Sequence, residues 1–110
     1  MSAPQFDELI HAPTRLAIMA LLAATDWADF AFVRDSVQLS DSALSKQLST
    51  LEAAHYIQIR KSFVGKRPRT SARLSREGRA AFTRHVAALQ QIVAAAQLTA
   101  GKDRPASVAG

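Results

Sequence analysis

Apolar residues recur at helical spacing through the first forty residues of the chain. Residues 4–11 and 13–24 each open with a proline, which is tolerated at the first position of a helix because its missing N–H would have no intrahelical partner there. Residues 30–37 continue the periodicity after a polar, turn-like break at 26–29. The pattern therefore predicts three helices. Their inward stripe is formed by Leu9, Leu16, Met19, Leu22, Phe30, Val33 and Val37.

A fourth helix is predicted over residues 41–54, only three residues after the third one ends. Ser40 can cap it by accepting a hydrogen bond from a free backbone N–H. Leu44, Leu48 and Leu51 fall on one edge of this helix and should face the core. Two helices joined by so short a turn are typical of a helix-turn-helix. The opposite edge carries short hydroxyls and one amine, from Ser42, Ser45, Lys46 and Ser49.

Small polar side chains of this kind allow a helix to enter the major groove of DNA and to bond phosphates or base edges. Taken alone, the same edge is equally consistent with an ordinary solvated helix face. The next part of the sequence bears on the choice between these two interpretations.

Residues 57–74 have the two-residue periodicity of a strand pair, with turn-forming residues at 65–68 between the strands. Three apolar residues of the first strand alternate as in a half-buried strand: Ile57, Ile59 and Phe63. On the returning strand, 69–74, the inner face is expected to hold Ala72 and Leu74, and the outer face Arg69, Ser71 and Arg73. The sequence thus predicts a basic hairpin after the helix-turn-helix.

Ser75 is placed to cap a last helix that begins at Arg76 and runs to about residue 97. Its predicted apolar stripe consists of Phe82, Val86, Leu89 and Val93. This stripe is longer than a small core can cover, so we expect a partner on it. The residues expected at a dimer interface are Val86, Leu89, Ile92 and Val93. Residues 99–110 are expected to form a disordered tail, which leaves 1–98 as the folded domain.

Charge is sorted along the chain, whose 110 residues suffice for one domain and carry a formal net charge of +5. Residues 1–40 hold two basic and five acidic side chains, whereas residues 41–85 hold ten basic and three acidic ones. The basic half coincides with the predicted helix-turn-helix and hairpin. An anionic partner such as nucleic acid is therefore expected.

Several other classes of protein are disfavoured by the sequence. There is no cysteine, and no apolar run approaches the roughly 20 residues of a membrane span. The N-terminus carries acidic residues where a secretory signal has a basic start, so we expect a cytoplasmic protein without membrane contact. No P-loop or nucleophile-elbow motif is present. The histidines His11, His55 and His85 lack metal-ligand spacing, and we expect no catalysis, cofactor or metal.

In their order and spacing, these elements resemble the winged helix-turn-helix transcriptional regulators of the MarR/ArsR-like group, as a compact single-domain member. Residues 39–52, LSDSALSKQLSTLE, are similar to the recognition helix of the family. His55-Tyr56-Ile57 resembles the step into the wing, and residues 74–82, LSREGRAAF, resemble the exit from it. The resemblance covers roughly residues 6–96.

The resemblance implies a mainly α fold with a small β-hairpin wing, in the order α-α-α-α-β-β-α. It also implies a homodimer that places one recognition helix of each subunit, residues 41–54, in successive major grooves. The wing, residues 57–74, would then lie on the flanking backbone or in the minor groove. The expected function is that of a sequence-specific regulator of transcription, a repressor that occupies a promoter.

The expected contacts to double-stranded DNA fall into two groups. Base discrimination is expected from the recognition helix, at Ser42, Ser45, Lys46, Gln47, Ser49 and Thr50. Affinity is expected from phosphate contacts of the wing, at Arg60, Lys66, Arg67, Arg69 and Arg73. Arg73 is also open to pairing with the acidic N-terminal half.

Two other functions remain open from the sequence. A winged helix can act as a protein-interaction module, for which binding to every duplex would stay at the non-specific level of about 10⁻⁴–10⁻⁶ M. An effector sensor would hold a small molecule or metal near Trp27, Phe30 or the histidines, but no sequence pattern supports a ligand site.

Overall fold

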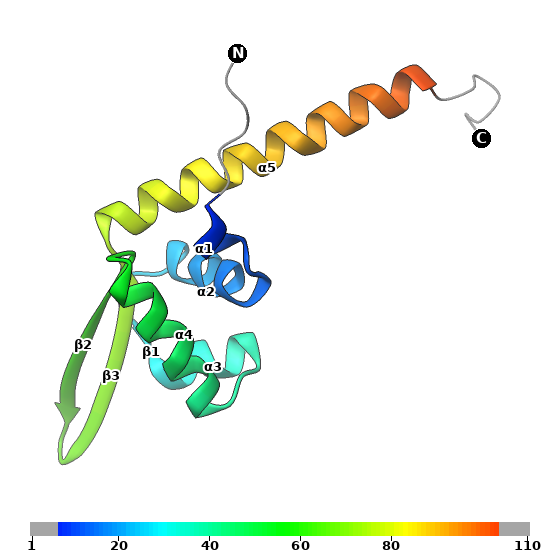
Figure 1. The fold of residues 1–110 in the computed structure, drawn as a ribbon. Coiled ribbons are helices and arrows are strands. Elements are labelled where there is room, and N and C mark those ends of the chain that lie inside the picture. Colours follow the sequence, from blue (N-terminus) through cyan, green and yellow to red (C-terminus); the bar gives the residue numbers. More distant parts are fainter. Residues whose placement is uncertain (1–6, 104–110) are drawn as a thin grey trace.

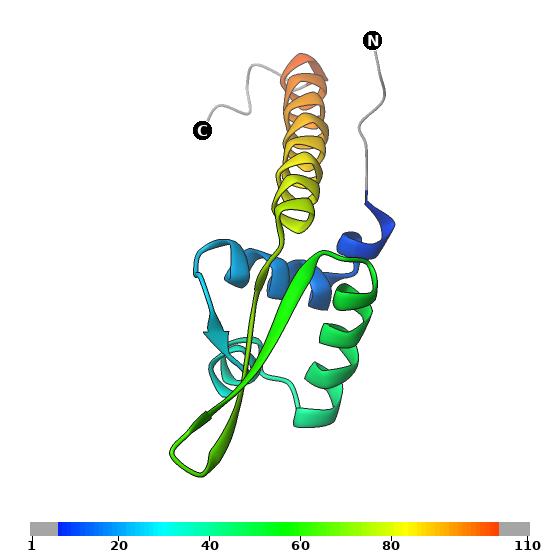
Figure 2. The same cartoon turned by 90° about the vertical axis from the view of Figure 1, so that its left-hand side faces the viewer.

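The computed structural model of the protein describes residues 7–103, with side chains described as far as Thr99. The elements are α1 (Glu8–His11), α2 (Pro13–Ala23), β1 (Ala28–Asp29), α3 (Phe30–Val37), α4 (Asp41–Ala53), β2 (Ile57–Val64), β3 (Arg67–Leu74) and α5 (Arg76–Asp103). Two elements project from a body of short helices (Figure 1): the β2–β3 hairpin and the distal half of α5. The view turned by 90° shows both projections again (Figure 2). The fold is that of a winged helix.

The helices begin at residues that satisfy their first backbone N–H groups. The Asp7 carboxylate accepts hydrogen bonds from the N–H groups of Leu9 and Ile10 at the start of α1. Ser40 Oγ accepts from the N–H of Ala43 at 3.1 Å, which caps α4 as predicted. The helices predicted over 13–24, 30–37 and 41–54 are confirmed to within one residue. The helix predicted over 4–11 begins only at Glu8, because Asp7 is extended and serves as its N-cap, and residues 4–6 lie outside the described residues.

The turn between α3 and α4 is held by backbone geometry and by an ion pair. Gln38 adopts the left-handed conformation, with a φ of 57°, and ends α3. The Arg34 guanidinium contacts the carboxylates of Asp35 at 2.9 Å and Asp41 at 2.8 Å. The hydrogen bonds that Arg34 donates to the carboxylate of Asp35, and then to that of Asp41, raise the pKa of Arg34. The contact with Asp41 links the first turn of α4 to α3.

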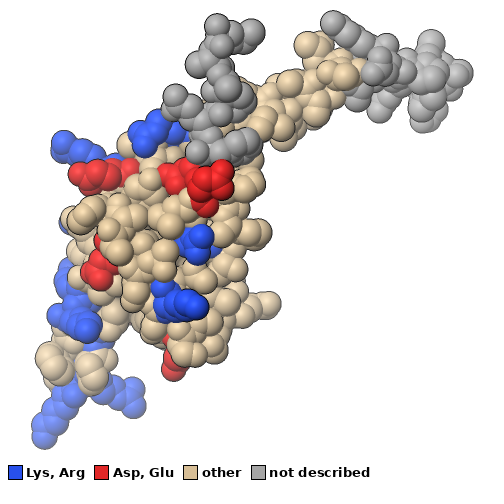
Figure 3. Space-filling view, in the orientation of Figure 1, with Lys and Arg blue, Asp and Glu red and all other residues tan. Residues whose placement is uncertain are grey.

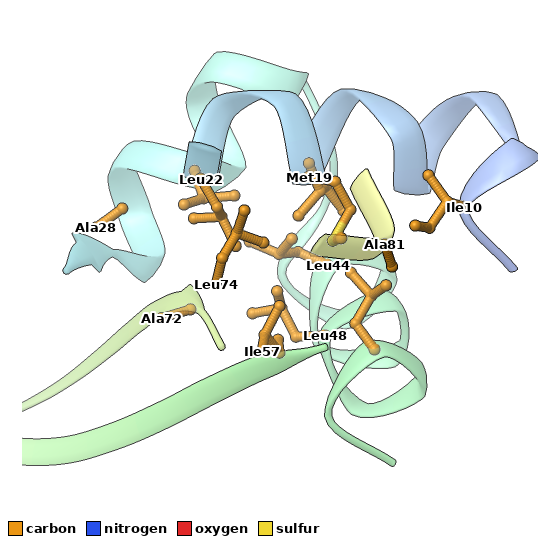
Figure 4. Close-up of a cluster of buried hydrophobic side chains, with 13 residues drawn as sticks. Ile10, Met19, Leu22, Ala28, Leu44, Leu48, Ile57, Ala72, Leu74 and Ala81 are labelled. Carbon is orange, nitrogen blue, oxygen red and sulfur yellow. The ribbon is translucent and has the colours of Figure 1, made fainter. Parts of the chain in front are cut away.

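One apolar core joins the helices to the base of the sheet (Figure 4). Leu44, Leu48 and Leu51 of α4 are 0, 3 and 0% exposed, so the predicted inward edge is confirmed. They belong to the same cluster as Met19 and Leu22 of α2. Burying a leucine contributes about 1.5–3 kcal/mol, so these three residues hold the rotation of α4 about its own axis.

The sheet has three strands, in the order β1-β3-β2, where the sequence predicted a hairpin alone. The segment 26–29 was predicted as a turn, but Ala28 pairs with Ala72 and Asp29 with Ser71. Ser71 is consequently 2% exposed, and its predicted outward position is wrong. A strand of two residues is too short to show an alternating pattern. The element order is therefore α-α-β-α-α-β-β-α.

The hairpin pairs from Ile57 opposite Leu74 to Val64 opposite Arg67. Its turn is shorter than predicted, because residues 67 and 68 already belong to β3. Gly65 adopts a φ of +64° in this turn, a conformation that glycine takes without strain. Phe63 is 72% exposed, so its predicted half-burial is wrong. The alternation continues along β2, but the body of the protein ends before Phe63.

Ser75 caps α5 as predicted, accepting a hydrogen bond from the N–H of Gly78 at 2.9 Å. The buried residues of α5 are Gly78, Ala81, His85 and Ala88. The predicted stripe residues Phe82, Val86 and Leu89 are half-buried, and Val93 is 54% exposed. The helix continues to Asp103, beyond residue 97 where it was expected to end. No helix in the described part of the chain has both the length and the apolar character needed to cross a membrane.

Candidate nucleic-acid interface

The outer edge of α4 is open to solvent. Ser42, Ser45, Lys46 and Ser49 are all exposed, on the side opposite the buried leucines. Within residues 7–103, the hydroxyls of Ser45 and Ser49 and the amine of Lys46 form no hydrogen bond or ion pair with the protein. These polar groups are therefore available to a ligand.

Gln47 and Thr50 lie on the flank of α4 rather than on this open edge. Gln47 Oε1 accepts a hydrogen bond from the Arg15 guanidinium of α2 at 3.1 Å. Thr50 Oγ1 donates to the Lys46 carbonyl at 3.1 Å. Both side chains are half-buried. The structure therefore separates these two predicted site residues from the four that face solvent.

A groove of about 580 Å³ runs between α4 and the hairpin. Ser45, Ser49 and Glu52 line it from α4, and Lys61 and Thr70 line it from the hairpin. Sequence reasoning missed Lys61 as a site residue. The two-residue periodicity of the strand could have identified it, because Lys61 lies on the same face of β2 as Ile57 and Ile59. The groove thus places an ammonium group beside the hydroxyl edge of α4.

Lys66 and Arg67 form the tip of the hairpin and are exposed. Figure 3 shows basic atoms at this tip, with no acidic atoms beside them on the face in view. Among the described residues, neither side chain has a carboxylate partner. Their charges are therefore uncompensated and suited to phosphate groups.

The other predicted wing cations are engaged by the protein itself. Arg69 contacts the Asp29 carboxylate at 2.7 Å. Arg73 donates to Gln58 Oε1 at 2.8 Å, and the Arg60 and Arg73 guanidiniums lie 4.2 and 4.4 Å from the centre of the Trp27 ring. The strand register places them on the face of the sheet opposite Lys61. Of the predicted wing cations, only the two at the tip are thus left without such contacts.

A shallow pocket of about 440 Å³ lies beside Trp27, lined also by Phe32, Arg60 and Arg69. The sequence left open a ligand site near Trp27, and this pocket is lined by Trp27. In residues 7–103, no group of three or more histidine and carboxylate side chains is arranged to hold a metal ion.

Behind the interface, a polar cluster ties α1 to α5 and to the start of β2. The Tyr56 hydroxyl donates a hydrogen bond to the Asp7 carboxylate. The Asp7 N–H donates to Nδ1 of the buried His85 at 3.1 Å, and His85 Nε2 lies 3.4 Å from His11 Nδ1. His11 and His85 therefore lie where α1 meets α5. Through Asp7, the cluster links Tyr56, the residue before β2, to α5.

The bond to the Asp7 carboxylate, followed by partial burial, raises the pKa of Tyr56 above its usual value of 10.0. Stability gained from the protonated hydroxyl is thus fully present below about pH 10 and is lost as the pH rises through the raised pKa. We expect Tyr56→Phe to lower the free energy of unfolding at pH 7 by about 1.5–3 kcal/mol. Urea unfolding at pH 7 and pH 11 measures both effects. An alkaline loss of stability as large in Tyr56→Phe as in the parent protein would contradict this assignment.

Comparison with known proteins agrees with this geometry. Residues 14–93 match the family model described as a winged helix DNA-binding domain. An uncharacterised protein of Methanocaldococcus jannaschii is 25% identical over 85 residues, which cover 77% of this chain and 92% of the relative.

Solved structures show the same fold. A transcriptional regulator homologue from Pyrococcus horikoshii OT3 superposes with a TM-score of 0.75 at 22% identity, over 81% of this chain and 88% of that one. The PcaV transcriptional regulator from Streptomyces coelicolor, solved with its natural ligand, has a TM-score of 0.68 at 20% identity, over 88% of this chain and 65% of its own. Lactococcus lactis ZitR, a zinc-responsive MarR family member, has a TM-score of 0.58 at 20% identity, over 82% of this chain and 61% of its own. Since the family model covers most of its length, this chain belongs to the winged helix DNA-binding domain family.

Proposed function

We propose that the protein is a cytoplasmic, homodimeric repressor of transcription that binds specific double-stranded DNA sites. In this proposal α4 enters the major groove and the β2–β3 hairpin lies along the flanking backbone or in the minor groove. The observation that carries it is that Ser45 and Ser49, from the open edge of α4, lie across one groove from Lys61, on the hairpin that carries the cationic tip. Hydroxyl and amine groups can bond base edges, while the tip cations neutralise phosphates.

The distal half of α5 supports the dimer. Ile92, Val93 and Leu98 are 39, 54 and 66% exposed on the part of the helix that projects from the body (Figure 1). Val86 and Leu89 are half-buried where the helix leaves the body. A second copy related by a two-fold axis would cover this apolar surface and place two α4 helices on one face of a duplex.

Selection from a random pool of duplexes, followed by footprinting, tests the proposal. We expect an inverted repeat whose half-site centres lie about one helical turn, roughly 10 bp, apart. A footprint without two-fold symmetry would contradict the dimer. Binding of every sequence at only about 10⁻⁴–10⁻⁶ M would instead favour a protein-interaction module.

Replacing Lys46 or Ser45 with alanine is expected to change the order in which the selected duplexes are preferred. The loss should be about 1 kcal/mol at the base pair that the side chain contacts and small elsewhere, because base contacts discriminate between sequences. Competition binding across the selected duplexes measures this. Ser36→Ala, an exposed serine of α3, is the matched control and should leave the order unchanged. An unchanged order in all three variants would refute base contact by the α4 edge.

A further inference from the structure

The hairpin tip exposes apolar side chains among its cations. Phe63 is 72% exposed and Val64 is 55% exposed at the end of β2. Phe63 lies directly opposite Pro68 of β3, so the two form an exposed cross-strand pair. Figure 3 shows this end of the hairpin standing free of the body, with basic atoms around uncharged surface. An unburied phenylalanine beside a proline at such a place would be stabilised by a partner that covers it.

The charges around this pair indicate an anionic partner. Lys61 lies two residues before Phe63 on the same face of β2, and Lys66 follows in the turn. Arg67 at the start of β3 pairs with Val64 and lies on the other face of the hairpin. No acidic residue occurs between Glu52 and Glu77. An aromatic ring on a hairpin whose end carries cations on both faces fits a partner that offers both negative charge and flat apolar surfaces. The stacked base pairs of DNA offer both.

The distance along the hairpin indicates which part of the duplex the ring would meet. Ile59 and Lys61 line the groove beside α4, and Phe63 continues the same face outward. Four residues of strand from Ile59 to Phe63 span about 13 Å. The major groove is roughly 12 Å wide. With α4 in the major groove, Phe63 would therefore lie past the phosphate backbone, at the neighbouring minor groove.

We propose that Phe63, supported by Pro68, inserts between two base pairs at the minor groove and kinks the duplex. The inference rests on the proposed function, since it requires α4 to occupy the adjacent major groove. Phenylalanine and proline are among the side chains that separate base steps from this groove, and such insertion bends DNA by about 20–90°. Flexible steps such as TA and CA would be favoured at the kink, which adds sequence preference at a step that no hydrogen bond reads.

The test uses a duplex recovered by selection, placed at the centre or at the end of a longer fragment. A bent complex migrates more slowly when the site is central, whereas a straight complex does not. We expect the parent protein to show this dependence, with Phe63→Ala losing it while still binding the duplex. Phe63→Leu should retain most of it because leucine still fills the space between base pairs. Val64→Ala is the matched control, since Val64 points to the other face of β2.

A second measurement reports the insertion itself. The fluorescent base 2-aminopurine, placed at the flexible step beside the footprint, should brighten on binding the parent protein, because it loses its stacking partner, and should stay dim with Phe63→Ala. The kink would be refuted if complexes of the parent protein migrated equally with the site at the centre and at the end of the fragment. It would also be refuted if the bend survived in Phe63→Ala. Neither result would contradict the proposed function. Dissociation of a dimer by Phe63→Ala, seen by sedimentation, would assign the pair to a subunit contact and refute the kink as well. Failure of the parent protein to bind any duplex would refute the proposed function and the kink together.

Discussion

Replacing Lys66 and Arg67 together with alanine is expected to weaken binding to every duplex by a similar factor. Each phosphate contact contributes about 0.9 to the slope of log affinity against log salt, so two lost contacts should lower that slope by about 1.8 per bound subunit. At about 0.1 M salt, the counterion release lost with each contact should weaken the binding affinity roughly eightfold. The loss of both contacts should weaken it roughly sixtyfold per subunit. Both residues are exposed and form no ion pair in the described chain, so the change should not affect folding. Fluorescence anisotropy titrations over a range of salt concentrations measure the slope.

A matched control separates position from net charge. Arg76 and Arg84 are exposed on α5, which lies at the end of the molecule away from the hairpin tip (Figure 1). Replacing both with alanine removes the same charge as the Lys66 and Arg67 double variant. This second double variant should retain the slope of the parent protein. If both double variants showed the same loss of affinity and the same decrease in salt dependence, binding would depend on overall charge. The hairpin tip would then not be a specific phosphate-binding site.

Gly78→Ala is expected to destabilise the fold by about 3 kcal/mol or more, although alanine is the better helix former. A Cβ added to Gly78 would lie 1.8 Å from the Tyr56 carbonyl oxygen and 2.7 Å from its carbon, both backbone atoms that cannot rotate away. The gain in helix propensity is only about 1 kcal/mol, whereas forcing atoms into a packed region costs about 1–3 kcal/mol and occasionally more. The same carbonyl accepts the Ser75 N–H at 3.0 Å, so relieving the overlap also disturbs the cap of α5. The melting temperature should fall by roughly 10–20 °C.

Gly65→Ala provides the comparison for that effect. Gly65 has a φ of +64° but no atom within 4 Å of an added Cβ, so the cost is only that of the left-handed conformation, about 1–2 kcal/mol. Calorimetry of both variants should therefore show the larger loss for Gly78→Ala. A Gly78 variant as stable as the parent protein would mean that α5 does not approach the Tyr56 backbone so closely in solution.

The helix-turn-helix was predictable because its signals are local. Leu44, Leu48 and Leu51 repeat at the helical period, and the cap at Ser40 lies three residues from the N–H that it satisfies. The exposure of the opposite edge follows from the same periodicity. The strand β1 escaped prediction because two residues carry no period, and its pairing partner Ala72 is more than forty residues away in the sequence.

The last helix shows where periodicity alone is insufficient. Its large apolar residues suggested a stripe through Phe82, Val86 and Leu89, but the side that packs on the body contains Ala81, His85 and Ala88. Small residues allow α5 to approach the body closely, which leaves the larger side chains on the flank and on the projecting half. Hydrophobicity identified an amphipathic helix, but it did not identify which face the body would cover.

The order of the helices, the inward edge of α4, its serine cap and the basic hairpin all follow from sequence patterns, since each depends on residues within a few positions of one another. Which of the hairpin cations lack a partner within the protein depends instead on the folded arrangement. Arg69 is paired with Asp29, forty residues earlier, and Arg73 contacts Trp27 and Gln58, whereas Lys66 and Arg67 extend beyond the reach of any described carboxylate. The folded arrangement also leaves Phe63 exposed. Burial and charge pairing depend on which distant segments meet in space, and a one-dimensional pattern does not contain that information.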